Sequence, residues 1–203
     1  MKMNNIKQII IITFLSAITF NLSVAQTGKV HSNGITIAYE AFGNKDNEAI
    51  ILIQGTGATM LHYPVELCQK LSSKGFYVIR FDNRDIGLST HLDSLGQPDW
   101  AAISPFIGTC NPAPLPYTLL DMGKDVTGLM DALEIKEAHI VGASMGAAIA
   151  QLIAINFPDR VLSLSLLGSS TGNPTRPQGN SDAIEAMSTP PPSTLNTDTL
   201  AIY

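Results

Sequence analysis

The stretch Gly142-Ala143-Ser144-Met145-Gly146 decides how this chain can fold, because it places a serine where a strand turns abruptly into a helix. Residues 138–141 form a short apolar run typical of a buried strand, and residues 147–157 form an apolar helix that Pro158 ends. In so tight a turn the residues two before and two after the serine approach neighbouring backbone, and here both are glycine. We therefore predict that Ser144 stands at the tip of the turn, beside the first amides of the helix. The alternative is a glycine-rich turn that holds a serine by chance.

Strand-like and helix-like segments alternate around this turn. A hairpin is expected over residues 29–42, with Asn33-Gly34 as its turn. Buried strands are expected over residues 49–53 and 138–141, further strands over residues 76–81 and 161–167, and helices over residues 64–71, 122–133 and 147–157. This order predicts an α/β fold with a mostly parallel sheet and helices on both faces.

The N-terminal segment, residues 1–25, is predicted to be a signal peptide. Two lysines precede an apolar run over residues 9–22 that is short for a membrane span, and Ser23-Val24-Ala25 offers small residues for cleavage before Gln26. An uncleaved membrane anchor is the alternative. We expect a secreted or periplasmic protein without a stable membrane span after cleavage.

Composition limits the partners of this chain. Its 203 residues carry a formal charge of −5, which becomes −7 without the signal peptide, and such an acidic chain argues against nucleic acid and anionic membranes. The 178 residues after cleavage suffice for one domain with a core. Cys68 and Cys110 leave open a disulfide or two thiols. No cofactor or metal is expected, because the histidines lie singly along the chain, at positions 31, 62, 91 and 139.

Two further motifs follow buried strands. Gln54-Gly55-Thr56-Gly57 comes directly after residues 49–53, where a backbone amide can help the amide after Ser144 to stabilise an oxyanion. An ordinary turn is the alternative. Residues 81–89, Phe-Asp-Asn-Arg-Asp-Ile-Gly-Leu-Ser, are dense in turn formers and charges. We expect Asp82 and Arg84 to hold a tight loop by hydrogen bonds and a local ion pair, rather than to act as an acid and a base.

Together these three motifs resemble the α/β-hydrolase fold from the hairpin through residues 161–167. The motif at residues 81–89 contains Asn-Arg-Asp-Ile-Gly, and Tyr-Thr-Leu-Leu-Asp-Met follows at residues 117–122. These two stretches are similar to the aclacinomycin methylesterase-like branch of the family. The resemblance implies Ser144 as nucleophile and the backbone N–H groups of Thr56 and Met145 as oxyanion donors. Gln54 stands where the family usually has histidine, which changes the support of this turn but not the backbone donor.

The resemblance also implies an acid and then a histidine after the serine. No histidine follows His139 in these 203 residues, and no feature marks Asp182, Glu185 or Asp198 as the acid. We expect residues 26–171 to form the N-terminal part of a hydrolase core. Residues 172–203 resemble the start of the family's cap segment, cut off before the C-terminal strands and most of the cap.

Three functions follow as expectations. The first is a serine hydrolase that acts on a small-molecule acyl or ester substrate through Ser144 and is impaired by truncation; the others are an inactive remnant or binding module, and a cofactor-free perhydrolase. A dehalogenase or epoxide hydrolase is disfavoured, because those enzymes use aspartate at the position of Ser144. We expect little or no esterase activity, since no base takes the serine proton, and marginal folding, since the edge at residues 161–167 is open. The sequence does not indicate the substrate's identity or the oligomeric state.

Overall fold

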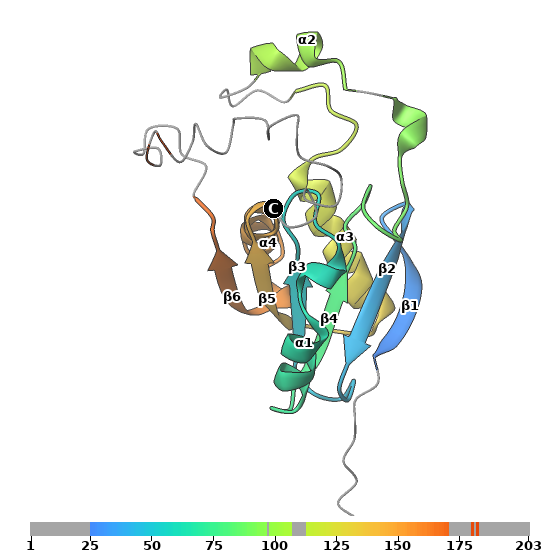
Figure 1. Ribbon diagram of the computed structural model, residues 1–203, viewed down its shortest axis with the longest axis vertical. Helices are drawn as coiled ribbons and strands as arrows, with labels where there is room; N and C mark the ends of the chain where they lie inside the picture. The colour runs from blue at the N-terminus through green and yellow to red at the C-terminus, as the bar shows by residue number, and fades with distance from the viewer. Residues whose placement is uncertain (1–24, 97, 107–112, 171–179, 181, 183–203) are drawn as a thin grey trace, which may run out of the picture.

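The computed structural model describes residues 25–96, 98–106, 113–170, 180 and 182. Its strands form one six-stranded sheet in the order β1-β2-β4-β3-β5-β6 (Figure 1). β1 and β2 form an antiparallel hairpin, β2 pairs antiparallel with β4, and β4, β3, β5 and β6 run parallel. The bounds are Gln26–Ser32 for β1, Ile35–Phe42 for β2, Ala49–Ile53 for β3, Tyr77–Phe81 for β4, Ala138–Ala143 for β5 and Val161–Leu167 for β6. The expected hairpin and mostly parallel sheet are confirmed.

Helices cover both faces of the sheet, as the sequence predicts (Figure 1). On one face lies α1 (Val65–Ser72), whose buried Cys68 packs with Ile50 and Val78. On the other face lie α3 (Leu119–Ala132) and α4 (Met145–Asn156). The two faces differ because successive strand residues point to opposite sides of the sheet.

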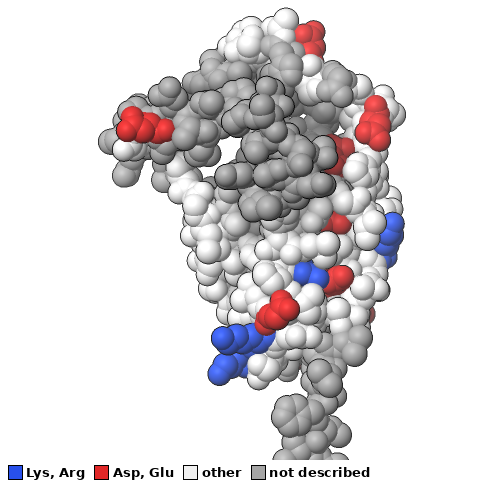
Figure 2. Space-filling view, viewed as in Figure 1, with Lys and Arg blue, Asp and Glu red and all other residues white. Residues whose placement is uncertain are grey.

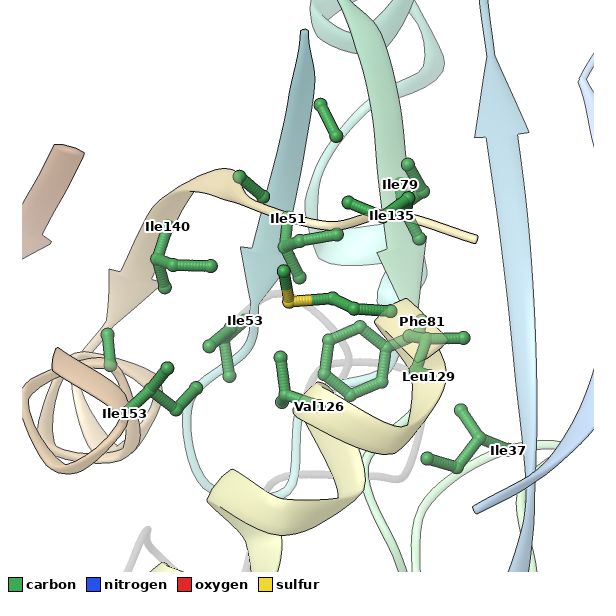
Figure 3. Packing of buried hydrophobic residues seen from close by; sticks show 14 of the residues in the cluster. Ile37, Ile51, Ile53, Ile79, Phe81, Val126, Leu129, Ile135, Ile140 and Ile153 are labelled. Atoms are coloured by element: carbon green, nitrogen blue, oxygen red, sulfur yellow. The ribbon is translucent and has the colours of Figure 1, made fainter. Parts of the chain in front are cut away.

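The principal core lies between the sheet and the helices α3 and α4 (Figure 3). Ile53 and Phe81, at the carboxyl ends of β3 and β4, pack with Val126 and Leu129 of α3, and none of these four side chains is exposed to solvent. Ile153 of α4 belongs to the same cluster. The core packing therefore extends to the carboxyl ends of the parallel strands, where ligands bind in open α/β sheets.

The segment between β4 and α3 corrects one expectation. The five prolines in residues 91–116 predict a loop, yet three short helical turns occur there: Asp93–Leu95, α2 (Trp100–Ile103) and Ser104–Phe106. Asp99 explains α2, because its carboxylate accepts hydrogen bonds from the N–H groups of Ala101 and Ala102 at 3.0 and 3.1 Å. This segment lies above the carboxyl ends of the parallel strands (Figure 1).

The structure shows the state of one of the two cysteines. Cys68 is a free thiol with no exposed surface, and burial raises the pKa of that thiol. Cys110 lies outside the described residues. Cys68 thus lies on the buried face of α1.

The outer edge of the described sheet is partly exposed. β6 is its last strand, and Leu162, Leu164, Leu166 and Leu167 along it are 37–52% exposed.

On the face shown in Figure 2, acidic and basic side chains lie scattered among uncharged ones. No helix among the described residues is long and apolar enough to cross a bilayer. The predicted signal peptide lies outside the described residues except for Ala25, and β1 begins directly after it at Gln26.

Candidate active site

Ser144 occupies the junction between the end of β5 and the start of α4. Its backbone has φ 51° and ψ −118°, and residues other than glycine rarely adopt a positive φ. The residue is exposed. The prediction of a strained serine at the tip of a strand-to-helix turn, called the elbow below, is confirmed in its geometry.

Both flanking glycines are required by close backbone approaches. A Cβ on Gly142 would lie 2.3 Å from the carbonyl oxygen of Gly146, on the opposite side of the elbow. A Cβ on Gly146 would lie 2.2 Å from the carbonyl oxygen of Ile53 at the end of β3. These distances are shorter than any van der Waals contact, so the helix can start this close to the sheet only with glycine at both positions.

The turn after β3 lies directly against the elbow. A Cβ on Gly55 would be 3.1 Å from Cβ of Ser144 and 3.7 Å from its Oγ. Gly57 has φ 71°, and the N–H of Ala58 donates to the carbonyl of Gly55 at 3.3 Å, so residues 55–58 form a tight turn. Thr56 of this turn is exposed, and Met145 is the first residue of α4.

Asp82 and Asn83, directly after β4, hold that turn from behind. Asn83 Nδ2 donates to the carbonyl of Gln54 at 3.3 Å. The buried carboxylate of Asp82 accepts from the N–H groups of Met60 at 2.7 Å and Leu88 at 2.8 Å. The interpretation of Asp82 as a structural residue of a tight loop is therefore confirmed, and its contact with Met60 also holds the chain that follows the turn at residues 54–57.

Arg84 differs from expectation, because its ion pair is not local. The guanidinium forms two hydrogen bonds with the carboxylate of Asp125 in α3, at 2.7 and 2.6 Å, and Asn33 Nδ2 donates to the same carboxylate at 2.9 Å. Arg84 and Asp125 are 7% and 3% exposed. The ion pair thus joins the loop after β4 to α3, and Asn33 joins the hairpin turn to the same carboxylate. Arg84 and Asp125 are 41 residues apart in the sequence, and no local sequence pattern connects them.

Tyr117 completes this buried cluster. The Arg84 guanidinium lies 4.9 Å from the centre of the Tyr117 ring. Burial, together with a hydrogen bond to Asp85, raises the pKa of Tyr117 to about 12, so the phenol stays protonated at neutral pH. Hydrogen bonds to Asp125 raise the pKa of Arg84, which stays charged. A cavity of about 600 Å³ lies beside Tyr117 and His91, and none of its lining residues belongs to the elbow or to the turn at residues 54–57.

The model of the α/β-hydrolase fold family matches residues 48–199, about three quarters of the chain. The chain belongs to the α/β-hydrolase fold family. Among curated proteins it is 28% identical over 141 residues to rhodomycin D methylesterase DauP from Streptomyces sp. strain C5, covering 70% of this chain and 41% of that protein. The chain thus spans about two fifths of the length of the curated relatives it matches.

Solved structures agree with this membership. A hydrolase from Pseudomonas aeruginosa is 28% identical with a TM-score of 0.53, covering 70% of this chain and 45% of that one. Epoxide hydrolase A from Mycobacterium thermoresistibile has a TM-score of 0.58 at 21% identity, covering 81% of this chain and 45% of that one. The second likeness shows the fold alone.

Within the described residues, the surroundings of Ser144 contain the turn at residues 54–57 but no side chain that could act as its base. Among the described residues, no side chain forms a hydrogen bond with Ser144 Oγ. His139 lies at the opposite end of β5 and contacts other groups. Of the three acidic residues named after the elbow, Asp182 is described, and its N–H donates to Asn180 Oδ1 at 2.9 Å, whereas Glu185 and Asp198 lie outside the described residues. Within the described ranges, no group of three or more His, Cys, Asp or Glu side chains could hold a metal ion.

Proposed function

We propose that this chain carries the nucleophile and the oxyanion donors of a hydrolase acting on a small-molecule ester. In this proposal Ser144 Oγ attacks the acyl carbon, and the N–H groups of Thr56 and Met145 stabilise the negative charge that develops on the acyl oxygen. The observation that carries it is the close approach of residues 54–57, called the oxyanion turn below, to the elbow. A Cβ on Gly55 would lie 3.1 Å from Ser144 Cβ.

Three features support the assignment. The φ of 51° at Ser144 is maintained by glycines on both sides, and such strain collects at functional sites. Among the described residues, the N–H groups of Thr56 and Met145 donate to no other group, so both remain available to a ligand. A curated relative at 28% identity is named as a methylesterase, which supports an ester as the substrate class.

A second candidate function is a binding module that keeps the acyl site without turnover. The observation that favours it is the absence, within the described residues, of a side chain hydrogen-bonded to Ser144 Oγ. A serine hydroxyl near its ordinary pKa is a poor nucleophile without an adjacent base. Oxyanion donors alone retain roughly 10³–10⁴-fold catalysis over water in enzymes stripped of their triad.

The two candidates are separated by covalent labelling together with turnover. The purified chain is treated with an activated phosphonate ester, which phosphonylates a nucleophilic serine, and its hydrolysis of p-nitrophenyl acetate is measured. We expect phosphonylation at Ser144, abolished in Ser144→Ala and retained in Ser165→Ala, with little turnover of the ester. Labelling unchanged in Ser144→Ala contradicts the nucleophile assignment. Fast turnover that Ser144→Ala abolishes contradicts the binding-module candidate.

We further propose that the chain is exported after cleavage between Ala25 and Gln26. The proposal is supported by the lysines and apolar run of residues 1–22 and by the start of β1 at Gln26, directly after the proposed cleavage site. N-terminal sequencing of protein recovered from the periplasm or medium is expected to begin at Gln26. Mature protein that begins at Met1 contradicts it.

A further inference from the structure

A second serine lies in a chain of hydrogen bonds at the end of the sheet opposite the elbow. His139 Nδ1 is 2.7 Å from Ser163 Oγ, and His139 Nε2 is 3.3 Å from a carboxylate oxygen of Glu48. The His139 side chain is 26% exposed, that of Glu48 is 69% exposed, and Ser163 is exposed. All three groups are therefore within reach of a dissolved reagent.

The sheet topology brings these residues together although 91 positions separate Glu48 from His139. His139 and Ser163 are partners in the parallel pairing of β5 with β6, so their side chains project from the same face. Glu48 immediately precedes β3, and β3 pairs with β5 so that Ala49 stands opposite Ala138. Three consecutive strands of the sheet thus supply a serine, a histidine and a glutamate at one edge.

The imidazole is held in position by three contacts. With the proton on Nε2, that nitrogen donates to Glu48 while Nδ1 accepts the Ser163 hydroxyl proton. The Phe76 ring meets the imidazole edge-on, with 5.7 Å between ring centres and 86° between planes. A hydroxyl within hydrogen-bond reach of a base that a third group orients is the arrangement that activates serine.

We propose that Ser163 is a second nucleophile, activated by His139 and Glu48, which accepts acyl groups from small activated esters. In the step, the bond from Ser163 Oγ to the acyl carbon forms and the bond from that carbon to the leaving alkoxide or phenolate breaks. The hydroxyl proton passes to His139 Nδ1, and the imidazolium then returns it to the leaving group or to water. The product is an O-acyl Ser163 and a free alcohol.

This site is separate from the elbow and does not rest on the function proposed for Ser144. His139 and Ala143 stand at opposite ends of β5, which places them roughly 13 Å apart at the rise of a strand. Ser144 lies beyond Ala143, so His139 does not serve both serines. The two nucleophiles can therefore be tested one at a time.

The neighbouring surface indicates which acyl donors are favoured. A cavity of about 250 Å³ reaches Glu48, and four carboxylates and two lysines line it. Its excess of negative charge repels anionic reagents, so uncharged esters are the preferred donors. Because none of the contacts described for this cluster stabilises an oxyanion, we expect single acylation rather than rapid turnover.

The test uses the full chain in a Ser144→Ala background, so that acyl groups on the two serines do not mix. The protein is treated with p-nitrophenyl acetate, and the rate of acetylation at each serine is followed by peptide fragmentation in a mass spectrometer. Ser165 is the matched control, because it lies on the same strand two residues away and stands opposite Val141 instead of a histidine. We expect Ser163 to be acetylated at least about tenfold faster than Ser165, a conservative threshold below the roughly 10²–10⁴-fold typical of general-base catalysis.

Three variants decide the outcome. His139→Gln is expected to lower the rate at Ser163 to that at Ser165. Glu48→Gln, which changes an exposed side chain and leaves folding intact, is expected to slow acetylation several-fold. His139→Ala is expected to regain acetylation when free imidazole is added, which a merely misfolded variant does not do. Equal rates at Ser163 and Ser165, or a rate at Ser163 unaffected by His139→Gln and Glu48→Gln, overturns the proposal.

Discussion

The two ends of β5 place two serines in different surroundings. At the carboxyl end, Ser144 has a strained backbone and the turn at residues 54–57 beside it, but no hydrogen-bonded base among the described residues. At the amino end, Ser163 has an oriented histidine but occupies an ordinary position in an edge strand. Strained backbone geometry and activation by a neighbouring histidine thus occur at different serines. The reactivity of each serine therefore tests one of these two features without the other.

The difference arises from how each arrangement is built. The elbow depends on main-chain approaches between β3, β5 and α4, which glycine alone permits. The Ser163 cluster depends on side chains that strand register sets opposite each other. Substitutions that move backbone should therefore disturb the Ser144 end, and substitutions of exposed side chains should disturb the Ser163 end.

The largest effect is expected from the buried ion pair that supports the elbow end. Arg84→Ala leaves the Asp125 carboxylate buried at 3% exposure without its two hydrogen bonds from the guanidinium. Breaking such a pair lowers the free energy of unfolding by about 3–5 kcal/mol. Urea denaturation measures the change.

The matched control is Lys45→Ala, which removes an exposed pair with Glu134 at 3.9 Å. Exposed pairs contribute about 0–1 kcal/mol, so this variant should unfold almost as the parent does. Equal losses in the two variants would show that the buried network does not support the loop after β4. The double variant Arg84→Met, Asp125→Leu is expected to regain most of the stability, because it removes both charges.

The sequence predicted the backbone of this molecule better than its side-chain contacts. The period-two and period-3.6 patterns placed the hairpin, the parallel strands and the helices, and glycine spacing placed the elbow, because each signal is local. Arg84 was correctly taken as structural, but its partner Asp125 is 41 residues away and no local pattern reveals it. His139 appeared to be isolated for the same reason, since only strand register brings Ser163 and Glu48 beside it.

The next effect tests whether the elbow depends on backbone approach. Gly146→Ala places a methyl group 2.2 Å from the Ile53 carbonyl oxygen, so α4 must move away from β3. Overpacking of this kind lowers stability by about 1–3 kcal/mol, and the displaced turn should also lose phosphonate labelling at Ser144. Labelling at Ser144 and the urea midpoint are measured together.

Gly123→Ala in α3 is the matched control, because its nearest non-local atom lies at an ordinary 3.4 Å. Alanine favours a helix by about 1 kcal/mol over glycine, so this variant should be as stable as the parent or more so. If Gly146→Ala retains both stability and labelling, backbone approach does not limit the elbow. Acetylation at Ser163 should be the same in both variants.

A smaller effect follows from the start of α3, which packs behind the elbow end. Asp121 and Thr118 form a reciprocal cap, and hydrogen bonds from Thr118, followed by one from Lys124, lower the pKa of Asp121 to about 2 from 3.8. The ionised carboxylate therefore stabilises the folded state above about pH 4, and this contribution is lost as the pH falls toward about 2.

Thr118→Ala should lower the free energy of unfolding by about 1 kcal/mol at neutral pH, as for other helix caps. Asp121→Asn should flatten the decline in stability between about pH 4 and pH 2, because it removes the group that titrates there. Urea unfolding across this pH range provides both measurements. A decline equally steep in Asp121→Asn would assign the acid sensitivity to another carboxylate.

The smallest effect compares the two serines directly and differs in sign between them. Ser144→Gly relieves a positive φ that disfavours side chains by about 1–2 kcal/mol, so we expect this variant to be more stable than the parent by about 1 kcal/mol. Ser163→Gly places glycine inside a strand and removes the hydrogen bond to His139, so it should be less stable by about 0.5–1 kcal/mol. Thermal unfolding of the two variants, each against its alanine counterpart, separates the backbone effect from the lost hydroxyl. If Ser144→Gly stabilises the protein, the fold tolerates backbone strain at this position in order to present a hydroxyl. If glycine destabilises the protein at both positions, Ser144 does not differ in strain from a serine in an ordinary strand.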